Sequence, residues 1–211
     1  MKEVIAICTH PENKELLNNL MRSLDDYTLR PIIIIVNEAP LILNEVEKFK
    51  YANATTYLNH DDGWELGALK FILDNTDYDE IFFMQDSCEL KDWGLFDLAF
   101  TEHSGKSVAM AFNFTSYIGK YRRAILEKLA IPKIENKKMA VYYEGAFNRD
   151  YLALDPEHII LDEKFSFPEH PNATFDEKFG RKNLITTNRW MTKYKAIWSS
   201  DRLYELYPEL K

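Results

Sequence analysis

Short apolar runs alternate along this chain with segments of helical period, and that alternation limits the possible folds more than any other feature. The first two runs, residues 3–8 and 32–36, are too short for helices and rich in β-branched side chains. Between them, apolar residues recur at the spacing of one helix face: Leu16, Leu17, Leu20, Met21 and Leu24. Strands that are apolar throughout are typical of parallel sheets covered on both faces. The segment is therefore predicted to form a βαβ unit with a right-handed crossover.

The same alternation continues to about residue 150. It predicts further strands at 54–58, 80–85, 107–113 and 138–143, and further helices at 64–74, 94–102 and 119–130. Thr9 and Glu12 have the spacing of a helix capping box. We predict an α/β fold with a mainly parallel, Rossmann-like open sheet and helices on both faces, followed by an irregular basic C-terminal extension.

Composition narrows the class of protein. The length of 211 residues suits one domain with a full hydrophobic core, which we place at residues 1–211. A net charge of −8 gives no overall electrostatic attraction to nucleic acid or anionic membranes. Two cysteines indicate a reducing compartment rather than a disulfide framework. Because the N-terminus reads as a strand and no run approaches the roughly 20 apolar residues of a membrane span, we expect a cytoplasmic protein.

Polar residues gather where three predicted strands end: Thr9 and His10, then Asn37 and Glu38, then Gln85, Asp86 and Ser87. Ligands of open α/β sheets bind outside the carboxyl ends of the strands. A carboxylate beside a buried strand is costly unless it is paired. Asp86, with Glu89 nearby, therefore suits Mg²⁺ or Mn²⁺, and such a metal implies a diphosphate ligand. The chain has neither a Walker A sequence nor a G-x-G-x-x-G motif to hold that diphosphate.

These segments resemble a glycosyltransferase of the GT-A type, a family that uses a nucleotide-sugar donor. The resemblance covers roughly residues 3–115 and lies in IAICTHPENKELLNNLMRSL, PIIIIVNE, GWELGALKFIL and YDEIFFMQDSCEL. In that family the fourth segment ends in Asp-x-Asp, which holds the metal and the donor diphosphate. The matching triplet is Gln85-Asp86-Ser87 or, alternatively, Asp86-Ser87-Cys88, and neither contains two aspartates.

The resemblance implies a nucleotide-sugar-binding half at 1–115 and an acceptor-side half with the extension at 116–211. It also implies donor contacts, which are Thr9, His10, Asn13, Asn37, Glu38, Gly63, Trp64, Glu65, Gly67 and Gln85. Mn²⁺ or Mg²⁺ would bind Asp86 and Glu89. A C-terminal histidine reaches the metal in some of these transferases, and His170 or His158 would match it.

Transfer of a sugar to a hydroxyl by direct displacement needs a general base. Glu144 follows the strand predicted at 138–143 and precedes Gly145. In the family a carboxylate base follows the metal motif at about such a distance, so Glu144 is the predicted base and Asp150 the reserve.

Residues 178–195 carry six Lys and Arg side chains and no acid. One interpretation is that they close over the donor diphosphate, with Arg181 and Lys182 as the contacts. A second is a nucleic-acid contact in which Trp190 and Tyr194 stack a splayed base, as in an enzyme that glycosylates a modified base in DNA. A third is a solvated helix face.

Structural interpretations and other functions stay open as well. Asp86 could cap the next turn, and His10 could be only a helix cap. Glu65 could complement the helix macrodipole, and Trp64 could belong to the core. A nucleotidyltransferase of related fold would normally carry a Gly-rich loop after the first strand, where CTHPENKE has no glycine. A catalytically inactive nucleotide- or sugar-binding module is the non-enzymatic alternative.

Overall fold

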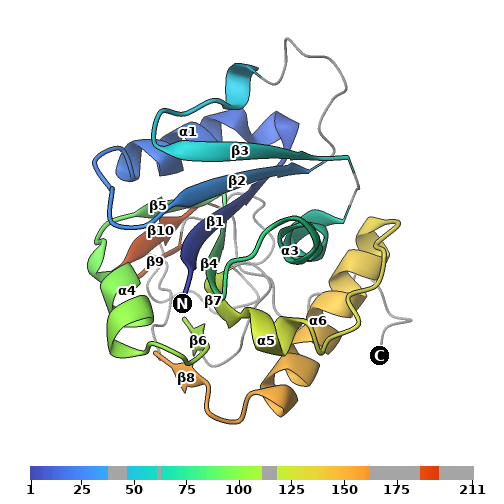
Figure 1. The fold of residues 1–211 in the computed structure, drawn as a ribbon. Helices are drawn as coiled ribbons and strands as arrows, with labels where there is room; N and C mark the ends of the chain where they lie inside the picture. The colour runs from blue at the N-terminus through green and yellow to red at the C-terminus, as the bar shows by residue number, and fades with distance from the viewer. Residues whose placement is uncertain (38–46, 61–62, 111–117, 162–185, 195–211) are drawn as a thin grey trace, which may run out of the picture.

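The computed structural model describes residues 1–37, 47–60, 63–110, 118–161 and 186–194. Its main sheet has seven strands in the order β3-β2-β1-β4-β7-β6-β8 (Figure 1). The strands are β1 Glu3–Thr9, β2 Ile32–Asn37, β3 Ala54–Asn59, β4 Glu80–Gln85, β6 Val108–Ala109, β7 Ile118–Arg122 and β8 Ile159–Ile160. Strands β1 to β4 run parallel to one another, and β7 runs antiparallel to β4 and β6. The predicted mainly parallel α/β sheet is confirmed.

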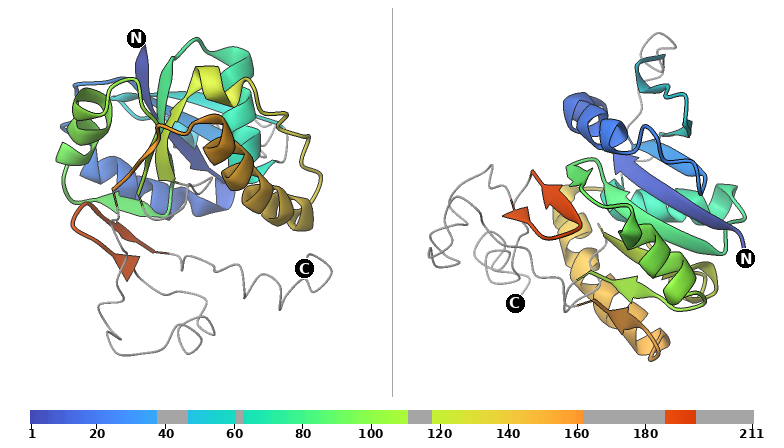
Figure 2. Two further views of the ribbon diagram at one scale, coloured as in Figure 1. Left: turned by 90° about the horizontal axis from the view of Figure 1, so that it is seen from below. Right: turned by 90° about the vertical axis from the view of Figure 1, so that its left-hand side faces the viewer.

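Alternate residues of the central strands face two hydrophobic layers. Ile5 and Ile7 belong to the layer covered by α1 (Lys14–Ser23), α4 (Gly94–Asp97) and the π-helical turn Leu98–Glu102. Val4 and Ala6 belong to the opposite layer, which contains α3 (Trp64–Asn75), α5 (Arg123–Leu126) and α6 (Lys137–Leu154). Figure 2 shows the helices on both sides of the sheet. Because both faces are covered, these strands are apolar at every position rather than at every second one.

Two short 3₁₀ turns complete the N-terminal half, at Pro11–Asn13 and Glu47–Phe49. The first lies directly before α1, and neither it nor α1 has a side-chain cap. The predicted capping box is therefore wrong. The Thr9 hydroxyl donates to the carboxylate of Asp86 instead, because the parallel register of β1 and β4 brings their ends together.

A small antiparallel sheet brings residues 186–194 back to the main body. It has the order β5-β10-β9, from Cys88–Leu90, Met191–Lys193 and Thr186–Thr187. Trp190 and Met191 join the core layer of α1, and Figure 2 shows this hairpin beside the main sheet. Within the described residues, the basic extension is thus a β-hairpin rather than a helix face.

The helix predicted at 119–130 is wrong, because residues 118–122 form β7 and only 123–126 are helical. Local sequence favoured a helix through its charged and long side chains. Pairing with β4 overrides that preference, since it buries Tyr121 in one layer and places the Lys120 ammonium against Glu80.

The strand predicted at 138–143 is also wrong, because these residues open α6. Asn136 caps this helix by accepting a hydrogen bond from the Met139 N–H at 3.0 Å. Ala140, Phe147 and Tyr151 then recur at helical spacing on its buried side. The strand predicted at 107–113 appears as β6 at 108–109, and residues 111–117 lie outside the described residues.

No helix within the described ranges has both the length and the apolar character needed to cross a membrane. The boundary expected at residue 115 between a donor half and an acceptor half stays a prediction. Strands from both sides of that boundary share the main sheet.

Candidate functional site

The ends of β1 and β4 meet at a buried carboxylate. Cys8 pairs with Gln85 in the parallel register, so Thr9 lies beside Asp86. The Thr9 hydroxyl donates to Asp86 Oδ2 at 2.8 Å, and the Asp86 N–H donates to the Cys8 carbonyl oxygen at 3.0 Å. Asp86 is only 4% exposed. Such a carboxylate needs compensation by hydrogen bonds and positive charge.

The ends of β2 and β3 carry two buried amides. Asn37 and Asn59 are paired in register, and Asn59 Nδ2 donates to Asn37 Oδ1 at 2.8 Å. Asn37 Nδ2 in turn donates to the Trp64 carbonyl oxygen at 2.5 Å. The Asn59 amide therefore orients the Asn37 amide, which in turn holds the backbone of Trp64 at this edge of the sheet.

The start of α3 is held in a strained conformation beside those amides. Trp64 has φ +46°, a left-handed value that costs a bulky residue about 1–3 kcal/mol. A Cβ on Gly63 would lie 2.6 Å from the Gly67 Cα, so only glycine fits before the helix. Contacts such as that of Asn37 hold the strained turn in place. The helix N-terminus, where anions are favoured, thus begins at the same edge.

A lysine from β10 reaches both neighbours of Asp86. Lys193 Nζ donates to Gln85 Oε1 and to Ser87 Oγ, each at 2.6 Å, and the Lys193 residue is 2% exposed. Gln85 Nε2 also donates to the carboxylate of Glu65 at the start of α3. The triplet Gln85-Asp86-Ser87 is thereby tied to both the small sheet and α3.

Glu89 is engaged by the same hairpin. The Tyr194 hydroxyl donates to its carboxylate, and the Tyr194 N–H donates to the Ser87 carbonyl oxygen at 2.8 Å. The hydrogen bond to Glu89, together with burial, raises the pKa of Tyr194.

The charges at this edge of the sheet affect the pKa values of two buried thiols, those of Cys8 and Cys88. Burial raises the pKa of Cys8 well above its usual value, and the carboxylates of Glu65 and Asp86 add to the effect. Burial also raises the pKa of Cys88, where the Lys193 ammonium opposes the shift and Asp86 reinforces it. A negative and a positive charge therefore act together at the end of β4.

Within the described residues, this arrangement does not form a complete site for a divalent cation. Among the residues that the structure describes, no three His, Cys, Asp or Glu side chains are grouped for a metal. Glu89 accepts from Tyr194, and the oxygens of Gln85 and Ser87 accept from an ammonium. A metal brought to those oxygens would meet a charge of like sign.

Six of the predicted residues meet at this edge of the sheet: Thr9, Asn37, Trp64, Glu65, Gln85 and Asp86. His10 and Asn13 lie just beyond β1, where His10 Nδ1 is 3.2 Å from Glu12 Oε1. Gly67 lies in the first turns of α3, with the Asn59 amide 3.8 Å from the position of a Cβ. Glu38, His170, Arg181 and Lys182 lie outside the described residues.

The two candidate bases lie on a helix rather than after a strand. Asp150 is exposed and accepts from Arg149 at 3.0 Å. The next residue, Tyr151, contacts the Arg122 N–H at 3.0 Å, at the end of β7 opposite the carboxyl edge. Glu144 precedes Tyr151 by two helical turns, or about 10 Å along the axis.

Two further predicted groups lie elsewhere. His158 Nδ1 is 2.8 Å from the Asp155 carbonyl oxygen, beside β8 rather than beside Asp86. Trp190 is 8% exposed, and the Arg189 guanidinium lies over its ring at 4.3 Å. The ring of Trp190 is thus packed in the protein rather than presented to a nucleobase.

Sequence reasoning missed Asn59 and gave Lys193 no individual role. Asn59 ends β3 just as Asn37 ends β2, so the strand-end rule could have found it. Lys193 had no local signal, because its position depends on the pairing of β10 with β5, about a hundred residues earlier in the chain.

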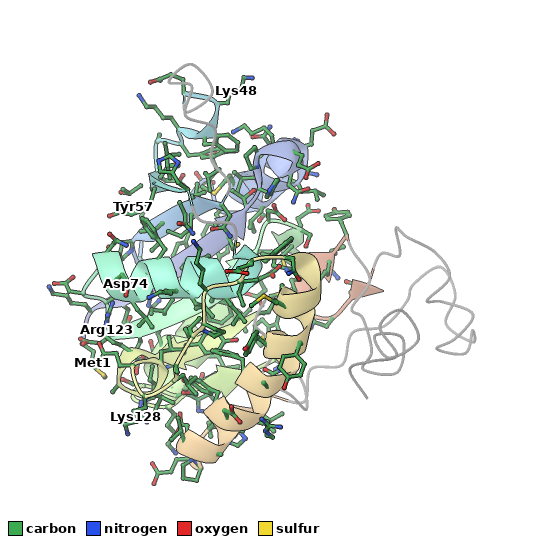
Figure 3. The ribbon with its side chains drawn as sticks, turned by 90° about the vertical axis from the view of Figure 1, so that its right-hand side faces the viewer. Met1, Lys48, Tyr57, Asp74, Arg123 and Lys128 are labelled. Carbon is green, nitrogen blue, oxygen red and sulfur yellow. The ribbon has the colours of Figure 1, made fainter. Side chains whose placement is uncertain are left out.

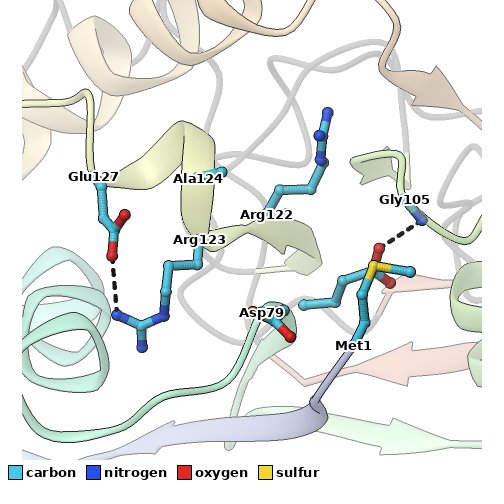
Figure 4. Close-up of a pocket in the computed structure, with 8 residues that line it drawn as sticks. Met1, Asp79, Gly105, Arg122, Arg123, Ala124 and Glu127 are labelled. Atoms are coloured by element: carbon cyan, nitrogen blue, oxygen red, sulfur yellow. Dashed lines mark hydrogen bonds and ion pairs between the residues drawn. The ribbon is translucent and has the colours of Figure 1, made fainter.

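A cavity of about 390 Å³ lies at the opposite edge of the sheet (Figure 4). Figure 3 labels Met1 and Arg123, which lie on the side of the molecule away from β9 and β10. The charged groups of this cavity stabilise the fold. Glu80 forms an ion pair with Lys120, and Arg123 donates to the carbonyl oxygens at the end of α3, such as those of Leu73 and Thr76. We therefore place the candidate site at the carboxyl edge.

No protein-family model matches this chain, and no curated protein is significantly similar to it. Among solved structures, S. aureus TarS 1–349 in complex with UDP is 14% identical with a TM-score of 0.49, over 78% of this chain and 59% of that one. The mannosyltransferase PcManGT from Pyrobaculum calidifontis, in complex with GDP-Man and Mn²⁺, is 10% identical with a TM-score of 0.47, over 61% of this chain and 46% of that one. This chain thus spans less than two thirds of either protein. Likenesses so distant say nothing of what this chain binds, and its function has to be argued from its own residues.

Proposed function

We propose that this chain is a glycosyltransferase that binds a nucleotide-diphosphate sugar at the carboxyl edge of β1, β2 and β4. The observation that carries the proposal is a group of buried polar side chains at neighbouring strand ends. Thr9 bonds Asp86, Asn59 bonds Asn37, and Lys193 of β10 bonds Ser87. Open α/β sheets bind their ligands at this edge. Burying charges and amides there is costly for stability, which is typical of a site kept for binding.

The two sides of the edge suit the two parts of such a donor. Neutral amides lie at β2 and β3, where the hydrogen-bonding groups of a base and ribose would match them. The Lys193 ammonium lies at the end of β4, beside the N-terminus of α3, and both favour a diphosphate. We assign the sugar to the start of α3, at Trp64, Glu65 and Gly67. His10, Asn13, Glu38, Arg181 and Lys182 remain proposed donor contacts.

The proposed reaction is a displacement at the anomeric carbon. The acceptor hydroxyl oxygen forms the new bond, a carboxylate takes its proton, and the bond to the diphosphate breaks with its electrons on the leaving group. Glu144 remains the proposed base; it lies on α6 two helical turns, or about 10 Å along the axis, before Tyr151, which contacts the opposite edge of the sheet. Asp150, beside Tyr151, is the reserve. The acceptor is proposed only as a hydroxyl compound, with a modified DNA base near 178–195 as one candidate.

The test is a hydrolysis screen of UDP-, GDP-, ADP- and dTDP-sugars that measures released nucleoside diphosphate. Each donor is tested with EDTA, with Mg²⁺ and with Mn²⁺, because the metal predicted at Asp86, Glu89 and His170 stays a prediction. We expect one nucleotide class to be hydrolysed and the matching nucleoside diphosphate, at 100 times its Kd, to add about 2.7 kcal/mol to the free energy of unfolding.

Asp86→Asn keeps the shape of the side chain and removes its charge, so turnover should fall at least 100-fold. The matched control is Asp74→Asn, at the exposed end of α3, where Asp74 forms an ion pair with Lys70 (Figure 3). That variant should keep full turnover. No hydrolysis of any donor, together with no stabilisation by any nucleoside diphosphate, would refute the proposed function.

A further inference from the structure

One lysine holds both residues that flank Asp86. The Gln85 amide oxygen and the Ser87 hydroxyl accept from Lys193 Nζ at equal distances of 2.6 Å. The backbone fixes this geometry, because Lys193 is paired with Cys88 between β10 and β5, and the Tyr194 N–H bonds the Ser87 carbonyl. The ammonium is therefore a built part of the strand end rather than a surface charge that happens to lie nearby.

Burial of the Lys193 ammonium costs desolvation free energy and also strengthens its electrostatic interactions. Lys193 is 2% exposed, and lysine is almost never so buried without compensation. The acceptors Gln85 and Ser87 are neutral, so these two hydrogen bonds orient the ammonium without adding a negative charge to it. In a dry site the ammonium charge acts over a longer range than it would in water. Lys193 and Asp86 both influence the Cys88 thiol, so their fields overlap at the end of β4.

We propose that the Lys193 ammonium, rather than a divalent metal, supplies the positive charge that a donor diphosphate meets at the Asp86 strand end. This inference rests on the proposed function. An ammonium binds phosphate as a compact point charge without demanding a fixed set of ligands. As the bond to the sugar breaks, negative charge grows on the leaving diphosphate, and a fixed cation stabilises that charge.

The residues at positions 85 and 87 support the same conclusion. A metal at this strand end would be expected to draw on carboxylates, yet these two positions offer an amide and a hydroxyl. Both are neutral acceptors suited to an ammonium. Asp86 then matches the charge of Lys193 in a buried setting instead of coordinating a metal.

The experiment measures UDP and GDP binding by calorimetry in EDTA and in Mn²⁺, for wild type, Lys193→Met, Lys193→Arg and Lys91→Met. Lys91 directly follows β5 of the same small sheet, and its ammonium is bonded to Asn188 and Thr187 at the turn, so it tests the hairpin alone. We expect wild type to bind one nucleotide in EDTA within threefold of its affinity in Mn²⁺. Lys193→Met should weaken binding at least 30-fold, and Lys193→Arg, which keeps the charge, should recover part of that loss. Lys91→Met should stay within fivefold of wild type.

Uridine and guanosine serve as probes without phosphate, and Lys193→Met should not change how they bind. Binding that requires Mn²⁺ and is indifferent to Lys193→Met would overturn the inference and leave the proposed function standing. Absence of any nucleotide binding by wild type would remove both. Thermal unfolding of each variant identifies loss of the fold, and the wild-type comparison of EDTA with Mn²⁺ decides the question even if Lys193→Met unfolds.

Discussion

Lys120→Met should destabilise this protein more than any surface charge deletion, and the reason lies in the middle of the main sheet. Lys120 on β7 is fully buried and its Nζ lies 2.7 Å from Glu80 Oε2 on β4, with Glu80 nearly as buried. The ammonium also donates to the His103 carbonyl oxygen at 2.9 Å, and Glu80 Oε1 accepts from the Gly105 N–H at 2.6 Å. Burial lowers the pKa of Lys120, and the interaction with Glu80 opposes that effect.

The size of the expected loss in unfolding free energy depends on the groups that stay buried after Lys120→Met. Methionine fills most of the space of the lysine side chain, so little cavity forms. The Glu80 carboxylate, however, stays buried without the ammonium and keeps the hydrogen bond from the Gly105 N–H. Leaving one member of a buried pair uncompensated costs about 3–5 kcal/mol. In a chain of this size that loss lowers Tm by roughly 10 °C. The exposed pair of Lys70 with Asp74 is the control, and Lys70→Met should cost under about 1 kcal/mol.

Urea unfolding followed by far-ultraviolet circular dichroism measures these free energies. Adding Glu80→Gln to Lys120→Met removes the stranded charge and should restore more than half of the lost stability. A loss below about 1 kcal/mol in Lys120→Met would refute the reasoning, because it would mean that water or rearrangement compensates Glu80.

Two further predictions concern the candidate site. Gly63→Ala should destabilise the fold by about 1–3 kcal/mol in the same urea assay, because its Cβ would lie 2.6 Å from the Gly67 Cα, whereas Gly67→Ala meets nothing closer than 3.8 Å and should be neutral or stabilising. Equal effects of the two would contradict the close approach. Cys8 and Cys88 should resist a thiol reagent in the folded protein at pH 8 and react only on unfolding, because burial raises both pKa values. Because the thiols have raised pKa values in the folded protein, they contribute stability at pH values below the ordinary thiol pKa. That stability is lost as the pH rises through the raised value. Fast labelling at pH 8 would show that the thiols are accessible and would contradict the prediction.

The central strands and their polar ends could be predicted from sequence because the signals are local. Each apolar run of β1, β2 and β4 is long enough for one strand, and the parallel order then brings Thr9, Asn37 and Asp86 to one edge. The prediction required only the rule that ligands meet the carboxyl ends of such strands.

The errors arose where distant contacts decide the outcome. Tyr121 and its neighbours have helical propensity, and only pairing with β4 makes them a strand. The apolar run at 138–143 is too short to identify by period, and the Asn136 cap and the burial of Tyr151 settle it as a helix. Lys193 was one of six basic residues in its segment, and nothing local distinguishes it from the others.

The hairpin that delivers Lys193 also sets an order of assembly. Adjacent strands of the central sheet join residues up to about 80 positions apart, whereas the Lys193 bond to Gln85 spans 108. During synthesis β1 to β4 leave the ribosome long before β10, so the sheet can close over its core while the end of β4 still lacks its ammonium. Completion of the strand end is then a separate, later event than formation of the sheet. A chain interrupted before residue 186 would retain every strand of the main sheet and lose the charge at the end of β4.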